Sequence, residues 1–264
     1  MNRILLFCAV ASSFGQTALA QHGFYSPFGP EEDHALSLPA CETARQISPA
    51  PAPASGAWEG TVDFSRGAAK LSLHVRASGI DEVRVFEDGS TAAGATLPVA
   101  LDISLPSDVR EEAVCADLNR DGRVDFVVSI WGHGNGLGAS DYLWLVGLST
   151  SSGYRFWSLD TMGTAPESFV TFGDLAPSAL LATAFVHVGT SDHAGPNQRH
   201  SYFAYDLWTF RGGDIVSANA IDARFPKYVQ MTNKENHKAS IRMSSNRPLV
   251  AGDVPKLLGA VEQR

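Results

Sequence analysis

The residues best placed to do chemistry lie in one short segment, residues 117–125, in which oxygen-bearing side chains recur at every second position around one glycine. Hard cations such as Ca²⁺ take six to eight oxygen ligands from carboxylates, side-chain amides and backbone carbonyls. Gly122 supplies the sharp turn that such a loop needs. The pattern predicts calcium as a cofactor. The expected ligands are the side chains of Asp117, Asn119, Asp121 and Asp125 and the backbone carbonyl of Arg123.

The same residues allow a second interpretation, an aspartate-rich turn whose side chains bond nearby backbone amides and hold no metal. Three carboxylates crowded into nine residues repel one another unless a cation lies between them, which favours the metal. Arg120 and Arg123 stand at positions whose side chains do not serve as ligands, so both side chains are expected to point outward.

The residues after the loop define its type. A helical EF-hand needs a glutamate at position 12, but that position is Val128, and residues 126–131 are β-branched or aromatic, which predicts a strand buried on both faces. A loop of this kind followed by an apolar strand resembles the calcium loops of FG-GAP and VCBS-type repeats. The resemblance implies a structural ion in a blade of an exported β-propeller of the adhesion or carbohydrate-associated kind. Only one such loop occurs here, which favours a sandwich or a partial, propeller-like assembly.

The N-terminus has the three parts of a secretory signal: Asn2-Arg3, the apolar residues 4–10, and small residues at Ala18 and Ala20. Cleavage is expected after Ala20, giving a periplasmic or secreted protein. No later segment contains 18 consecutive apolar residues, so no transmembrane segment is expected after cleavage.

Cleavage leaves two cysteines, Cys41 and Cys115. An even pair in an oxidising compartment predicts a disulfide, which would contribute about 4 kcal/mol by restricting the unfolded chain. The alternative is two buried free thiols.

The chain divides by composition into a signal peptide (1–20), an extended arm rich in Pro, Ala and Ser (21–55) and a β domain that includes the calcium loop (56–264). Strand-like runs separated by Gly and Ser turns predict an all-β, antiparallel fold. A short helix is expected over residues 254–261, capped by Asp253.

Charge is unevenly distributed: residues 21–223 contain 11 Lys and Arg against 25 Asp and Glu, and residues 224–264 contain 8 against 3. The basic tail is expected to fold against the acidic body, the alternative being an anionic partner. An exported acidic protein is not expected to bind nucleic acid.

Two further segments contain candidate ligand-binding residues. Residues 134–139 fit a Gly-x-Gly-x-x-Ala fingerprint, but the strand-like run that follows argues against a dinucleotide site and leaves a glycine-rich loop. A second, polar loop spans residues 189–199 and could bind zinc, act as general acid and base, or serve as a binding loop. The candidates are His133 and Asn135 in the first segment and His187, Asp192, His193 and His200 around the second.

The sequence therefore predicts an exported, calcium-stabilised protein that binds a partner protein or an envelope glycan without catalysis. One alternative is an exported hydrolase centred on His187, Asp192 and His193 and supported by calcium. Another is a periplasmic inhibitor or immunity-type protein.

Overall fold

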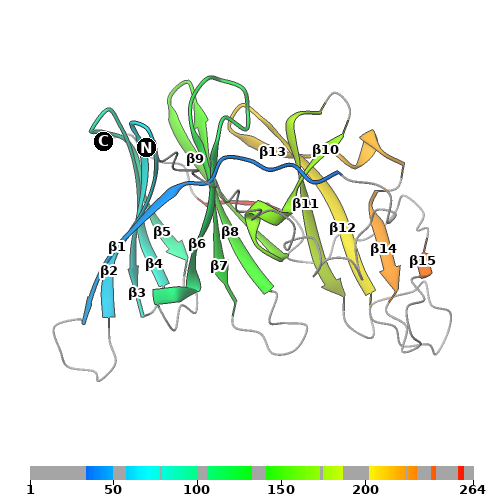
Figure 1. Cartoon of the computed structure of the whole chain (residues 1–264), viewed down its shortest axis with the longest axis horizontal. Helices are drawn as coiled ribbons and strands as arrows, with labels where there is room; N and C mark the ends of the chain where they lie inside the picture. Colours follow the sequence, from blue (N-terminus) through cyan, green and yellow to red (C-terminus); the bar gives the residue numbers. More distant parts are fainter. Residues whose placement is uncertain are drawn as a thin grey trace, which may run out of the picture.

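Three antiparallel β-sheets lie side by side along the longest axis of the molecule (Figure 1). The computed structural model describes residues 34–49, 58–77, 79–99, 106–132, 141–172, 175–186, 202–223, 225–230, 239–241 and 255–258. Within these ranges, helix is limited to short 3-10 turns such as η3 (Pro106–Asp108) and η5 (Ala165–Ser168). None of the described helices is long and apolar enough to cross a membrane. The prediction of an all-β, antiparallel fold is confirmed.

The first sheet is a meander in which each strand pairs with the next along the chain. Its β2–β4 strands alternate buried apolar and half-buried or exposed polar residues, the pattern of a sheet with one face on the core. Its strands are β1 (Glu42–Pro49), β2 (Trp58–Arg66), β3 (Ala69–Arg76), β4 (Gly79–Glu87) and β5 (Ser90–Val99).

The central sheet has the order β16-β9-β8-β7-β6. Every residue of β7 except Trp131 is buried, which confirms the prediction of a strand covered on both faces. Its strands are β6 (Val109–Ala116), β7 (Asp125–Trp131), β8 (Asp141–Thr150), β9 (Gly153–Met162) and β16 (Lys256–Leu257).

The third sheet has the order β10-β11-β12-β14-β15, and β13 also pairs with β12. Its strands are β10 (Phe169–Phe172), β11 (Leu175–Val186), β12 (Tyr202–Arg211), β13 (Asp214–Ser217), β14 (Lys227–Gln230) and β15 (Ala239–Ile241).

The central sheet is buried on both faces because it contributes to two hydrophobic cores. Phe126, Val128 and Ile130 of β7 belong to the first core, which they share with β2, β3 and β4. Val127 belongs to the second core, with Trp208 and other residues of the third sheet. Successive side chains of a strand point to opposite faces, so one apolar run serves both cores.

Residues 34–49, here called the strap, cross all three sheets (Figure 1, blue). Ala35 forms a bridge with Val170 of β10, and Ala40 forms one with Val114 of β6. The strap then continues as β1, which pairs with β2 over its whole length. This part of the Pro/Ala/Ser-rich N-terminal segment is thus a structural element of the β domain.

The prediction of a helix over residues 254–261 is wrong for residues 255–258, the part of this range that the structure describes. Lys256–Leu257 forms a strand, β16, that pairs with β9. The Leu258 amide donates a hydrogen bond to the Phe156 carbonyl at 2.8 Å. Leu258 also packs against the first core. The open edge of β9 offers unpaired backbone groups, and a helix of eight residues has little stability of its own.

Candidate functional site

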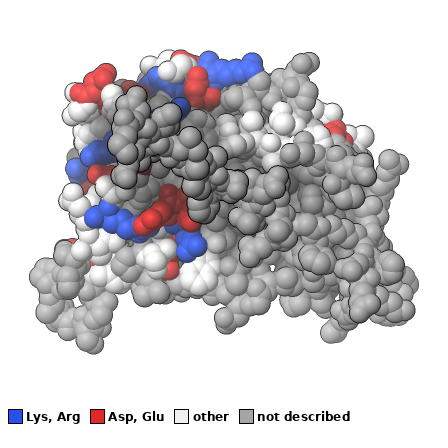
Figure 2. Space-filling view, in the orientation of Figure 1, with Lys and Arg blue, Asp and Glu red and all other residues white. Residues whose placement is uncertain are grey.

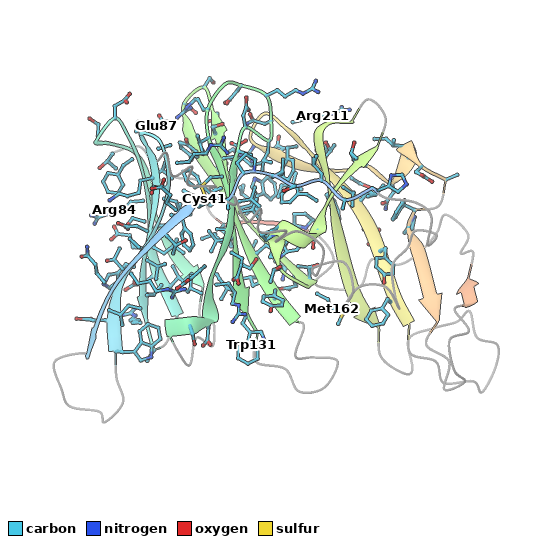
Figure 3. All side chains as sticks on the ribbon, in the orientation of Figure 1. Cys41, Arg84, Glu87, Trp131, Met162 and Arg211 are labelled. Carbon is cyan, nitrogen blue, oxygen red and sulfur yellow. A yellow bond between two sulfur atoms is a disulfide. The ribbon has the colours of Figure 1, made fainter. Side chains whose placement is uncertain are left out.

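Loop 117–125 connects β6 to β7 at one edge of the molecule, where the β4–β5, β8–β9 and β12–β13 turns also lie. Figure 3 labels Glu87 and Arg211 on this edge, and Trp131 and Met162 toward the opposite edge. All three sheets therefore present a turn near the loop. Its side chains can reach groups from each of them.

Side-chain oxygens near the start of the loop bond its own backbone amides. The two Asp117 oxygens accept from the amides of Asp121 and Gly122, at 3.0 and 2.9 Å. The Asp121 amide also donates to Asn119 Oδ1 at 3.1 Å. Gly122 has φ +85°, and Arg120 has φ 64°. The positive φ at Gly122 is the sharp turn that the sequence predicts.

Asp125 is fully buried and anchors the end of the loop. Its Oδ2 accepts from the amides of Leu118 and Asn119 at 2.7 and 3.2 Å. Its Oδ1 accepts from the Ser149 amide and hydroxyl at 2.7 and 2.8 Å. Burial raises the pKa of the Asp125 carboxyl to about 6, against the opposing effect of these hydrogen bonds.

Ser149, at the end of β8, brings the two carboxylates of Asp121 and Asp125 together. Its hydroxyl oxygen lies 2.9 Å from both Asp121 oxygens and 2.8 Å from Asp125 Oδ1. A hydroxyl has a single proton to donate, so it can satisfy only one of these three acceptors at a time. Negative charge is thus concentrated around Ser149. Nothing in the spacing of the sequence pointed to this residue.

The loop bonds to the first and central sheets through Arg123. The guanidinium donates to Glu87 of β4 through Nε at 3.0 Å and Nη2 at 2.8 Å, and to the backbone carbonyl of Thr150. Tyr154 of β9 completes the cluster by donating to Glu87 at 2.9 Å. Arg120 is exposed as expected, but the outward orientation expected for Arg123 is wrong because its side chain is held in this ion pair.

Asn119 connects the loop to the third sheet. Its side-chain nitrogen donates to the Ser149 carbonyl at 2.7 Å and to the Gly212 carbonyl, in the β12–β13 turn, at 2.9 Å. Two carbonyl acceptors fix the orientation of the amide, since only nitrogen can donate to them. The Asn119 oxygen therefore faces the loop.

The expected calcium ligands differ in how many of their oxygen lone pairs are already used by hydrogen bonds and how many are left for a metal ion. An ionised carboxylate has about four lone-pair positions. Three backbone amides occupy three of those of Asp125, and Asp125 competes with Asp121 for the single proton of the Ser149 hydroxyl. Asp117 accepts two hydrogen bonds, so about half of its capacity remains. In the described part of the chain, no group of three or more His, Cys, Asp or Glu side chains is arranged to hold a metal ion. The calcium site therefore stays a prediction.

The predicted disulfide between Cys41 and Cys115 is confirmed. The two Cα atoms are 5.0 Å apart, within the usual range for a disulfide. It joins the strap to β6 two residues before the loop begins. The six candidate ligand-binding residues all lie outside the described residues: His133, Asn135, His187, Asp192, His193 and His200.

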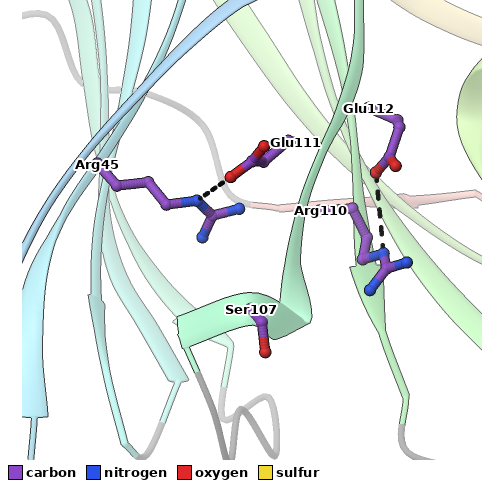
Figure 4. A pocket seen from close by; sticks show the side chains of 5 residues that line it. All are labelled: Arg45, Ser107, Arg110, Glu111 and Glu112. Atoms are coloured by element: carbon purple, nitrogen blue, oxygen red, sulfur yellow. Dashed lines mark hydrogen bonds and ion pairs between the residues drawn. The ribbon is translucent and has the colours of Figure 1, made fainter.

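A cavity of about 420 Å³, which sequence reasoning did not find, lies where the strap passes β6 (Figure 4). Arg45 of the strap donates to Glu111 at 3.1 Å, and Arg110 lies 3.9 Å from Glu112. The cavity thus combines donors and acceptors. The described residues that line it are Arg45, Ser107, Arg110, Glu111 and Glu112. Figure 2 shows acidic and basic side chains interleaved over the described part of one face of the molecule.

Comparison with known proteins identifies no relative: no family model, no curated protein and no solved structure matches the chain.

Proposed function

We propose that the protein is an exported, non-catalytic binding protein in which calcium stabilises loop 117–125 and the cavity beside the strap receives an envelope glycan. The observation that carries this proposal is that the loop bonds to all three sheets, through Arg123 to Glu87, through Asn119 to Gly212 and through Asp125 to Ser149. An ion that fixes the loop therefore fixes the relative positions of the sheets.

The residues that would hold calcium are Asp117, Asn119 and Asp121, together with the backbone carbonyl of Arg123. Bound calcium would supply positive charge among the carboxylates around Ser149, where the hydroxyl offers one proton to three oxygens. Asp125 already accepts hydrogen bonds from three backbone amides, so we assign it the anchoring of the loop. Export is supported by the signal-like N-terminus and by the Cys41–Cys115 disulfide.

A glycan suits the cavity better than an apolar ligand because guanidinium groups donate and carboxylates accept, and a sugar hydroxyl does both. Its volume of about 420 Å³ is within the range of small-ligand sites. The resemblance of the loop to those of carbohydrate-associated proteins points to the same class of ligand.

The test is equilibrium binding of soluble cell-envelope oligosaccharides, measured by calorimetry with calcium present. Glu111→Gln and Arg110→Met change the cavity, and Arg84→Met is the matched control because Arg84 pairs at 2.7 Å with Glu82 in the first sheet, outside the cavity lining. We expect at least tenfold weaker binding by the cavity variants and unchanged binding by the control. Failure of every oligosaccharide to bind, or equal binding by all variants, contradicts the proposal. Selective binding of an envelope protein instead would assign a different ligand class.

A further inference from the structure

Residues 34–41 of the strap are attached to the third and central sheets by a small number of backbone hydrogen bonds, whereas β1 pairs with β2 along its whole length. At the third sheet, the Leu36 amide donates to the backbone carbonyl of Phe169 at 3.0 Å, and the Thr171 amide donates to the backbone carbonyl of His34 at 2.8 Å. At the central sheet, the amides of Cys41 and Cys115 donate to Ala113 and Pro39, both at 3.0 Å. At the first sheet, β1 forms the edge strand beside β2.

Side-chain packing adds little to this attachment. None of the side chains of residues 34–47 is buried, and they alternate between half-buried and exposed. Leu36 and Leu38 pack partly against the second core, and Ile47 packs partly against the first. The disulfide lies in the middle of the strap, between its contacts with the first and third sheets, and is the only covalent link within the described residues that joins the strap to β6.

We propose that the Cys41–Cys115 disulfide is a redox latch that holds residues 34–41 of the strap closed over the third and central sheets, and that reduction by a dithiol releases these residues while the sheets, β1 included, stay folded. The two cores consist mainly of residues from the sheets themselves, so they persist without the strap. Residues 34–41 form only isolated bridges at the edges of the third and central sheets, so their release leaves the strand order of all three sheets intact, with β1 still paired with β2.

The exchange has a defined direction because the two sulfurs differ in access. Cys115 is fully buried, whereas Cys41 is half-buried, so a thiolate of the dithiol attacks Cys41 Sγ. The S–S bond breaks, and Cys115 leaves as a thiolate and takes a proton. The second thiol of the dithiol then displaces Cys41, which also takes a proton. The dithiol is oxidised by two electrons to its own disulfide, and the protein disulfide is reduced by two electrons.

Release of residues 34–41 would also loosen the cavity, because Arg45, which follows shortly after Cys41 in β1, forms one of its walls. Arg45 is held there by Glu111 and by the backbone carbonyl of Val109, and the Thr43 hydroxyl donates to the Glu111 carbonyl at 3.1 Å. This consequence rests on the proposed function: glycan binding would require the oxidised protein. The latch itself is tested without any ligand, so the two proposals can fail separately.

The experiment is amide hydrogen exchange of the full chain in a Cys8→Ser background, oxidised and after treatment with dithiothreitol and alkylation. We expect the amides of Leu36, Cys41 and Thr171 to exchange at least tenfold faster after reduction, with the amides of β8 and β9 unchanged. Unchanged exchange in the strap overturns the proposal. Equally accelerated exchange in β8 and β9 also overturns it, because the disulfide would then stabilise the whole fold.

A second variant removes the dependence on alkylation. In Cys41→Ser, with Cys8→Ser, the free Cys115 thiol reports strap opening through its rate of reaction with iodoacetamide. Because Cys115 also belongs to the first core, we expect a rate at least tenfold above that expected from global unfolding alone, with unchanged near-ultraviolet circular dichroism from the sheets. A Cys115 thiol that stays protected in this variant overturns the proposal, as does loss of the circular dichroism signal.

Discussion

The side-chain amide of Asn119 donates to the backbone carbonyl of Gly212 at 2.9 Å, so a residue of the predicted calcium loop holds the β12–β13 turn of the third sheet. The same nitrogen donates to the Ser149 carbonyl at 2.7 Å in the central sheet. A residue expected as a metal ligand thus also connects two sheets through its other side-chain atom.

Asn119→Asp separates these two roles because it keeps an oxygen for calcium and removes both donations. In the presence of a chelator we expect the free energy of unfolding to fall by about 2–3 kcal/mol, since a carboxylate would then face two carbonyls. Urea unfolding followed by circular dichroism measures this difference. Asn219→Asp, in η6 (Asn219–Ile221), is a matched control that should leave calcium dependence unchanged. Equal stability of wild type and Asn119→Asp would contradict the role assigned to the amide.

The ion pair between Arg123 and Glu87 should contribute to stability as a pair. Arg123→Lys loses the bidentate hydrogen bonding of the guanidinium to the two Glu87 oxygens, and Glu87→Gln loses the negative charge of the carboxylate. We expect a double-mutant cycle to give a coupling energy of about 1–2 kcal/mol. The exposed pair Arg84 and Glu82 should give less than about 1 kcal/mol in the same experiment. Additive effects of the Arg123 and Glu87 substitutions would show that the pair does not join the sheets.

Asp125 should make stability depend on pH in an unusual direction for an aspartate. Burial raises its pKa in the folded protein to about 6, above the ordinary value of 3.8, so the folded state binds a proton that the unfolded state has released. Without calcium, lowering the pH from 7 to about 4 should therefore raise stability by up to about 3 kcal/mol, from 1.36 kcal/mol per pKa unit.

Asp125→Asn removes this titration and serves as the comparison. The stability of Asp125→Asn should be lower at every pH because an amide cannot accept hydrogen bonds at both side-chain positions, but this variant should lack the gain between pH 7 and 4. The carboxyl of Glu87 has a lowered pKa, first through its hydrogen bond with Arg123, so its contribution to stability is present above its ordinary pKa of 4.5 and is lost as the pH falls below it. Parallel stability curves for the two proteins would contradict the assignment.

Gly60 should be required for the strap to lie in place. A Cβ at this position would lie 2.2 Å from the Gln46 carbonyl oxygen and 2.7 Å from Ile47 Cα, both in β1. We expect Gly60→Ala to lower the free energy of unfolding by about 2–3 kcal/mol. Gly67→Ala, in the β2–β3 turn, meets no atom within 4 Å and should cost only about 1 kcal/mol through its positive φ. A Gly60→Ala protein as stable as wild type would show that β1 can move without cost.

The sequence predicted those parts of the structure that depend on the composition and spacing of nearby residues. The strand β7 was predictable because a strand that is buried on both faces is apolar at consecutive positions, as the residues after the loop are. The two cysteines remaining after the expected cleavage specified the disulfide. The positive φ of Gly122 followed from the spacing of the loop.

Long-range contacts were not predictable in this way. Ser149 and Glu87 meet the loop only because three separate turns converge at one edge, and no spacing in the chain encodes that convergence. The strap and β16 pair with the exposed edges of existing sheets, so their structure depends on partners far along the chain. For this reason the C-terminal helix expected from side-chain periodicity was wrong.

The most direct test of the central claim is calcium-dependent thermal unfolding of the wild type and Asp121→Asn, each dialysed against chelator and then supplied with calcium. Calcium at 100 times Kd should stabilise the wild type by about 2.7 kcal/mol, a rise in Tm of about 5–10 °C for a chain of this size. Asp121→Asn, with one carboxylate fewer, should need at least tenfold more calcium for the same rise. Identical melting of the wild type with calcium and with chelator, and no heat of calcium binding, would contradict the claim.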